Sequence, residues 1–165
     1  MDRQAQIDFI LDHYENPRNY GPLENPSVVQ KGGNPGCGDV VTFYLKVNGD
    51  DRIEAISFEG EGCTISQAAS SLVTEMFTGR TLAEIEATPS EAILDILGRE
   101  IAGTRLKCAT LGLNTTKEAV RMLRREVHLQ PRVSTILPVL GGTHYLGGAL
   151  RREEIYDDDR QENVA

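Results

Sequence analysis

The chain has 165 residues, of which 39% are apolar, and this predicts one domain with an ordinary buried core and excludes wholesale disorder. Its formal net charge of −8 repels phosphate, which excludes nucleic acid as an expected partner. The sequence has no apolar run of about 18 residues, as a membrane span needs, and its polar start, Met1-Asp2-Arg3-Gln4, disfavours export, so we expect no membrane partner and a reducing, cytoplasmic location.

The first half of the chain predicts one helix and a small antiparallel sheet. Apolar residues on one face predict a helix over residues 3–14, which should end before Pro17 because the residue preceding proline avoids the helical region. Asn48-Gly49 is typical of a tight turn between two strands. Apolar patterning, with alternation in the second segment, predicts strands at Val28–Val29, 41–47 and 53–58.

The second half of the chain predicts helices and a tail. Pro131 should end the folded domain, so we expect a domain over residues 1–130 and a C-terminal tail over 131–165, with a short helix near Leu150. The predicted class is α+β, with about three antiparallel strands, helices on one face and a metal site at one end. Helical patterns cover the segment after Cys63 up to Gly79, then 81–86, 90–97 and a long last helix over 108–126.

Three cysteines, Cys37, Cys63 and Cys108, carry the clearest chemistry in the sequence. An odd number does not complete a disulfide framework, and a cytoplasm would keep the thiols reduced. Cys37 lies in a glycine-rich loop, and Asp39 projects to the same side if that segment is extended. Cys63 and Cys108 lie at the starts of predicted helices, where the thiolate is favoured. All three are at element ends, which the fold could bring together.

Three thiolates and the Asp39 carboxylate would make a four-ligand set. Sulfur donors select zinc or iron–sulfur clusters over magnesium or calcium. We infer that one harder oxygen ligand makes a labile corner, which suits a protein that releases its cargo. Alternatively the cysteines are small buried apolar residues and Asp39 is a turn-former or cap. The cysteine spacings of 26 and 45 residues match no standard zinc-finger pattern, so spacing alone leaves both readings open.

Five motifs accompany these residues in a fixed order. They are His13-Tyr14-Glu15-Asn16-Pro17-Arg18-Asn19, Gly33-Asn34-Pro35-Gly36-Cys37-Gly38-Asp39, Gly60-Glu61-Gly62-Cys63, Thr64-Ile65-Ser66-Gln67-Ala68-Ala69-Ser70-Ser71 and Arg105-Leu106-Lys107-Cys108. Together they resemble the IscU/NifU/SufU family of iron–sulfur cluster assembly scaffold proteins. The likeness spans about Met1 to Val127, and several motifs in order are more specific than any one alone.

The resemblance implies a site and partners. It implies that Cys37, Asp39, Cys63 and Cys108 hold a [2Fe–2S] cluster, or zinc in the purified protein, at one end of an α+β fold. It implies a scaffold rather than an enzyme, with a cysteine desulfurase delivering sulfur as a persulfide and apo iron–sulfur proteins receiving the cluster. Cys108 is the expected persulfide acceptor, followed by Cys63 or Cys37.

The sequence departs from IscU-type members at Lys107, where those proteins have histidine. Lysine there resembles the SufU and NifU branches, although the insertion typical of SufU proteins is missing between Cys63 and Cys108. Lys107 is expected to be either a solvated surface charge or a cation that offsets the ligand charge or pairs with Asp39. Ala102-Gly103-Thr104-Arg105 replaces a proline-rich chaperone motif, so no dedicated Hsp70-type chaperone is expected.

Three functional hypotheses follow. The first is a cluster assembly scaffold, and the second is a SufU-like zinc-dependent sulfur-transfer partner of a cysteine desulfurase. The third is a structural zinc protein, in which loss of Cys108 would destabilise the fold rather than abolish sulfur acceptance.

Overall fold

Helix α1 (Arg3–Glu15) begins the part of the chain that the computed structural model describes, which is residues 2–129. The Asp2 side chain accepts a hydrogen bond from the Ala5 backbone N at 2.8 Å, which satisfies a donor that the first turn leaves free. The helix ends at Glu15, one residue later than predicted, just before Asn16-Pro17. The predicted tail over residues 131–165 and its short helix lie outside the described residues.

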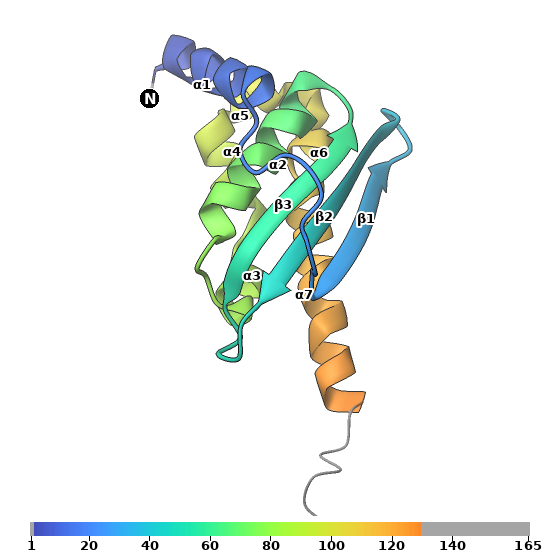
Figure 1. The fold of residues 1–165 in the computed structure, drawn as a ribbon. Coiled ribbons are helices and arrows are strands. Elements are labelled where there is room, and N and C mark those ends of the chain that lie inside the picture. Colours follow the sequence, from blue (N-terminus) through green and yellow to red (C-terminus); the bar gives the residue numbers. More distant parts are fainter. Residues whose placement is uncertain (1, 130–165) are drawn as a thin grey trace, which may run out of the picture. The chain divides into compact units, whose positions relative to one another are not determined.

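Three antiparallel strands in the order β1-β2-β3 form the sheet (Figure 1). They are β1 (Val28–Asn34), β2 (Asp39–Val47) and β3 (Ile53–Glu61). The predicted alternation in β2 is confirmed, because every second side chain from Val41 to Leu45 is fully buried. Strand β1 is longer than predicted, since its pairing with β2 continues through two glycines to Asn34, opposite Asp39. Residues 35–38 are therefore the tight turn of a hairpin.

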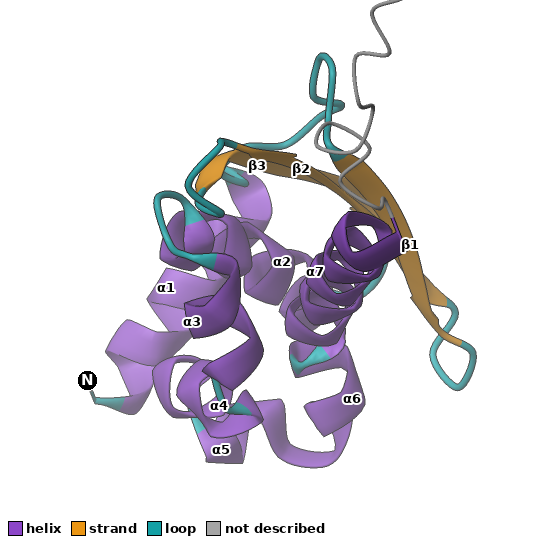
Figure 2. Cartoon of the chain, turned by 90° about the horizontal axis from the view of Figure 1, so that it is seen from below, coloured by secondary structure: helices purple, strands orange, loops and turns teal. Residues whose placement is uncertain are grey.

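Helices cover one face of the sheet, which confirms the α+β class (Figure 2). Phe43 and Phe58 stack at 5.8 Å between ring centroids and are fully buried in the core. Within residues 2–129, no helix combines the length and hydropathy that crossing a bilayer requires. The helical elements after the sheet are α2 (Thr64–Phe77), α3 (Leu82–Ala87), α4 (Ser90–Leu97), α5 (Arg99–Ala102), the 3-10 turn η1 (Gly103–Arg105), α6 (Leu106–Ala109) and α7 (Leu111–Leu129).

The long last helix predicted from Cys108 is two helices, so that prediction was wrong at its start. Cys108 lies in the four-residue α6, and α7 begins only at Leu111. Between them, Thr110 turns its hydroxyl back to donate to the Leu106 carbonyl at 3.0 Å. Threonine that bonds to the preceding turn bends helices, and an apolar pattern carries no signal of such a bend.

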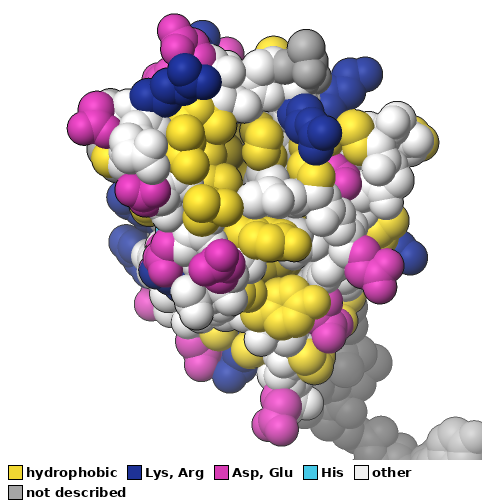
Figure 3. All heavy atoms as spheres, turned by 90° about the horizontal axis from the view of Figure 1, so that it is seen from above, with side chains coloured by type: hydrophobic (Ala, Val, Ile, Leu, Met, Phe, Trp, Pro, Cys, Tyr) yellow, Lys and Arg dark blue, Asp and Glu magenta, His cyan; other side chains and the backbone are white. Residues whose placement is uncertain are grey.

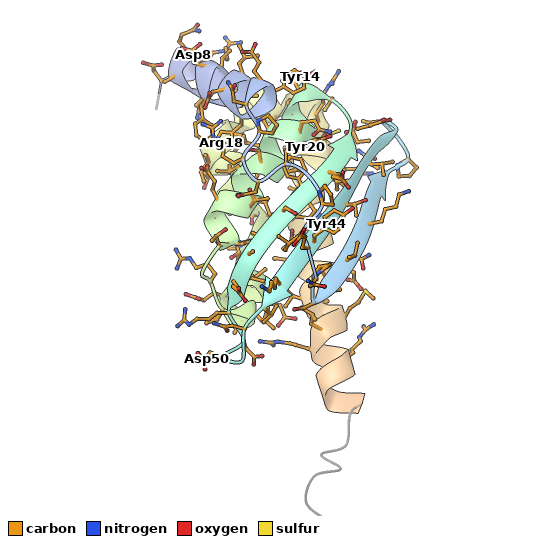
Figure 4. The ribbon with its side chains drawn as sticks, in the orientation of Figure 1. Asp8, Tyr14, Arg18, Tyr20, Tyr44 and Asp50 are labelled. Carbon is orange, nitrogen blue, oxygen red and sulfur yellow. The ribbon has the colours of Figure 1, made fainter. Side chains whose placement is uncertain are left out.

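Two ends of the molecule differ in what they carry. The β1–β2 turn, the end of β3 and the start of α2 lie at the upper end in Figure 1, together with α6. The β2–β3 turn, which bears Asp50, lies at the opposite end (Figure 4). Because neighbouring strands run antiparallel, the β1–β2 turn and the last residues of β3 lie at the same end of the sheet.

Candidate metal centre

Four elements position the four predicted ligand residues. Cys37 lies in the β1–β2 turn, and Asp39 is the first residue of β2. Cys63 is the N-cap residue of α2, immediately after β3, and Cys108 lies in α6. Residues that are up to 71 positions apart in the chain thus meet at one end of the sheet.

Distances between the ligand atoms place three of the four predicted ligand residues close together and leave the fourth, Cys63, farther away. The Cys108 and Cys37 sulfurs are 3.3 Å apart. One ligand atom from each of Cys37, Asp39 and Cys108 lies within 4.8 Å of the other two, and Cys63 stands outside this trio. Cys63 nevertheless contacts Asp39, with 3.7 Å from its Sγ to Oδ2 and a 3.0 Å hydrogen bond from its backbone N to Oδ1.

The four ligand residues differ in their access to solvent. Cys37 is exposed and Cys63 is half-buried, whereas Cys108 and Asp39 are buried. Seen from above, this end of the molecule shows apolar side chains interspersed with charged ones (Figure 3). An incoming group would therefore reach the Cys37 sulfur first and the Cys108 sulfur last.

Asn34 supports the site, and the sequence reading named it only as part of a motif. Its Nδ2 lies 3.5 Å from the Cys108 sulfur, and its Oδ1 accepts from the Gly36 backbone N at 3.2 Å. Its own carbonyl accepts from the backbone N of Cys37 at 3.1 Å. The buried Asn34 therefore connects the turn that carries one cysteine to the sulfur of another.

Gly62 lets Asp39 approach the start of α2. A Cβ at position 62 would lie 2.9 Å from Asp39 Oδ1 and 2.5 Å from Ser66 Oγ, closer than real Cβ contacts allow. Close packing against Asp39 and Ser66 thus explains why glycine stands directly before Cys63 in this motif.

The environments of Cys63 and Cys108 push their pKa values in opposite directions. Burial raises the pKa of Cys63, but hydrogen bonds from the backbone and hydroxyl of Ser66 and from Arg105 outweigh it and leave that pKa below its usual value. Burial raises the pKa of Cys108, and hydrogen bonds to Asp39 and Cys37 raise it further. The expected lowering of the thiol pKa at a helix start is therefore found at Cys63, whereas at Cys108 burial shifts the pKa the other way.

Two cations flank the site, and they differ in what they contact. Lys107 is exposed and lines a groove of about 870 Å³ between β1, α6 and α7, next to Cys37 and Cys108. Arg105 lines that groove and also a pocket of about 510 Å³ formed with Cys37, Asp39 and Cys63. Sequence reasoning singled out Lys107 and missed Arg105, because only the fold of η1 brings position 105 to Cys63.

The donor set fits a thiophilic metal ion or an iron–sulfur cluster. Sulfur ligands and one carboxylate suit zinc and iron–sulfur centres and do not suit the all-oxygen coordination of magnesium or calcium. Tetrahedral zinc with four protein ligands would need Cys63 to join the trio of Cys37, Asp39 and Cys108.

Known proteins are similar to this chain in both sequence and fold. A model of the NifU-like N terminal domain family matches residues 5–129. The chain belongs to this family. It is 40% identical over 120 residues to the iron-sulfur cluster assembly scaffold protein IscU of Azotobacter vinelandii, covering 71% of this chain and 92% of that protein.

Two solved structures have a fold similar to that of this chain. A putative iron-sulfur cluster assembly scaffold protein for the SUF system, from Fervidobacterium islandicum AW-1, is 31% identical with a TM-score of 0.57, over 68% of this chain and 94% of that one. The N-terminal part of a NifU-like protein from Brucella abortus has a TM-score of 0.65 at 22% identity, over 73% and 99% of the two chains, and bears on the fold alone. The resemblance to the IscU/NifU/SufU group is confirmed.

Proposed function

We propose that this chain is a scaffold on which a [2Fe–2S] cluster is assembled and then passed to apo iron–sulfur proteins. The observation that carries the proposal is the meeting of Cys37, Asp39 and Cys108, with Cys63 in contact with Asp39. The scaffold names of its relatives support this assignment and a non-enzymatic role.

Sulfur would arrive as a persulfide on a cysteine desulfurase. A scaffold thiolate attacks the outer sulfur, the S–S bond to the desulfurase breaks, and the desulfurase cysteine leaves as a thiolate. Two electrons from an external electron donor then break the S–S bond of the scaffold persulfide, which regenerates the scaffold thiolate and leaves the transferred sulfur as sulfide. A second transfer would supply the second sulfide that a [2Fe–2S] cluster needs, and Cys37, Asp39, Cys63 and Cys108 would hold the two irons.

Cys108 is the proposed final acceptor of this sulfur. It is buried, and the exposed Cys37 sulfur 3.3 Å away offers a first landing point from which a second exchange reaches it. After incubation with desulfurase and free cysteine, peptide mapping by mass spectrometry should place the added sulfur of the parent protein on Cys108, whereas in Cys108→Ser it should remain on Cys37. Added sulfur on Cys63 or Cys37 of the parent protein, with none on Cys108, would move the final acceptor to that residue.

A SufU-like zinc-dependent sulfur-transfer role is the second candidate. It is favoured by Lys107 directly before Cys108 and by the likeness to the SUF-system structure. In that role zinc bound by the same residues would organise them until a desulfurase captures one cysteine.

Anaerobic reconstitution separates the two roles. With ferrous iron, a desulfurase, free cysteine and a reductant, a scaffold should develop the visible absorbance of a [2Fe–2S] cluster, and acid-labile sulfide should match its iron. Cys63→Ser is the control that should lose this chromophore. Tight zinc binding with strong stimulation of the desulfurase, and no chromophore under any condition, would favour the second role.

We further propose that residues 1–130 make up the scaffold domain and residues 131–165 a tail. The family match to residues 5–129 supports this boundary.

A further inference from the structure

Arg105 makes a contact inside the ligand set that the scaffold role alone does not call for. Arg105 lines the same pocket as Cys37, Asp39 and Cys63, which places its positive charge beside the Cys63 sulfur. The pKa of Arg105 is raised, first by hydrogen bonding to Cys63 and then by the negative charge of Cys63, with smaller contributions from Cys108 and Cys37. This cation is thus within electrostatic reach of all three sulfurs.

A guanidinium and a metal ion make the same demand on Cys63. Each is a cation that needs the negative charge and lone pairs of the thiolate, and arginine keeps its charge at any working pH. Cys63 is also the ligand that stands outside the trio of Cys37, Asp39 and Cys108. For Cys63 to join the trio around one ion, its sulfur would have to share with the metal the negative charge that now offsets Arg105.

The position of Arg105 suits such an exchange. It is the last residue of η1, its side chain is exposed, and it stands only three residues before Cys108. A long exposed side chain can leave for solvent at little cost, because its charge is hydrated there.

We propose that Arg105 competes with a bound metal ion for the Cys63 thiolate and so acts as a built-in displacing cation. When the ion is held, Arg105 turns outward; when the ion leaves, Arg105 takes over the Cys63 charge. This rests on the proposed metal-holding role of the four ligands, and it adds a residue that makes release easier.

Zinc affinity tests the proposal directly. In the full-length protein, competition against a chromophoric chelator should give Arg105→Gln a Kd for zinc about tenfold lower than the parent, a change of about 1.4 kcal/mol. Arg105→Lys, which keeps a cation, should stay closer to the parent. Lys107→Gln is the matched control, because it removes a nearby exposed charge that lines the neighbouring groove. An unchanged or weaker zinc affinity in Arg105→Gln, or an equal gain in Lys107→Gln, would overturn the proposal.

A double-mutant cycle shows whether the effect runs through Cys63. In a Cys63→Ser background, Arg105→Gln should leave the Kd for zinc unchanged, because the contested sulfur is gone. A tenfold gain that persists in that background would refute the competition. The Co²⁺ complex adds a spectroscopic readout, since Arg105→Gln should reach the full thiolate-to-metal charge-transfer absorbance at lower Co²⁺ concentration.

These measurements stand apart from the scaffold proposal. They need neither iron, sulfide nor a desulfurase, so failed cluster assembly would leave the zinc comparison readable. Conversely, unchanged zinc affinities would remove the role of Arg105 and leave the scaffold role intact.

Discussion

At the residue scale, the two carboxylate oxygens of Asp39 make different contacts. Oδ1 accepts a hydrogen bond from the Cys63 backbone N at 3.0 Å, while Oδ2 lies 3.7 Å from the Cys63 sulfur. The carboxylate is buried at the start of β2, and Gly62 leaves room for it. Asp39 is therefore placed by the α2 N-terminus and is also the one hard donor in the ligand set.

We expect Asp39→Ala to hold a reconstituted cluster longer than the parent protein. Removing the oxygen ligand removes the corner that we infer exchanges most readily, so transfer to an apo-ferredoxin should slow several-fold. Circular dichroism of the cluster during anaerobic transfer measures the rate. Faster transfer or spontaneous loss would contradict this account of Asp39, and an unchanged far-UV spectrum serves as the folding control.

At the element scale, the absence of a side chain at Gly32 allows strand β1 to pack closely against helix α7. A Cβ on Gly32 would stand 1.9 Å from Thr115 Oγ1, so the strand and helix could not keep their present spacing. At Gly33 a Cβ would meet only the Asp39 carbonyl at 3.6 Å, which is ordinary contact. These neighbouring glycines thus differ sharply in their tolerance of a side chain.

Gly32→Ala should lower the free energy of unfolding by about 1–3 kcal/mol, the usual cost of overpacking. Gly33→Ala is the matched control and should change it by much less. Urea unfolding followed by far-UV circular dichroism gives both values. Similar losses in the two variants would mean that glycine flexibility, and not the contact with Thr115, governs this strand.

The sequence patterns predicted the elements better than their junctions. The alternation in β2 was readable because it reflects a single buried face. The length of β1 depends on pairing with β2 and packing on α7, and the break at Thr110 depends on a local side-chain bond. Neither leaves a periodic signal.

The same limit applied to the site. The three cysteines and Asp39 were readable from motif and residue chemistry, and Arg105 and Asn34 were not. Those two act through contacts with residues 42 positions back and 74 positions ahead, which only the folded chain supplies.

At the scale of the whole molecule, a buried histidine ties the N-terminal helix to the helical layer. His13 Nδ1 lies 2.8 Å from Ser71 Oγ, and its Nε2 lies 3.5 Å from Glu75. Burial lowers the pKa of His13, with the nearby Arg18 adding to the shift and Glu75 and Asp12 opposing it. The folded protein therefore binds a proton at His13 less readily than the unfolded chain does.

Stability should consequently fall as the pH drops below the ordinary histidine pKa of about 6.5. Below that value the unfolded chain takes up a proton that the folded state resists, so protons favour unfolding; above it the effect vanishes. Urea unfolding at about pH 7.5 and 5.5, with a chelator present to remove metal effects, should show a smaller drop for His13→Gln than for the parent. An equal drop in both would assign the pH dependence to the carboxylates.

The scattered origin of the four ligands has a consequence for folding as well as for cargo. An ion bound simultaneously by residues of the β1–β2 turn, β2, the α2 N-terminus and α6 would act as a reversible cross-link between distant parts of the chain. Such a cross-link restricts the unfolded chain, as a disulfide does, and it vanishes when the ion departs. Handing over the cargo would therefore also loosen this end of the protein, and a partner that prefers the looser form would help to draw the cargo out.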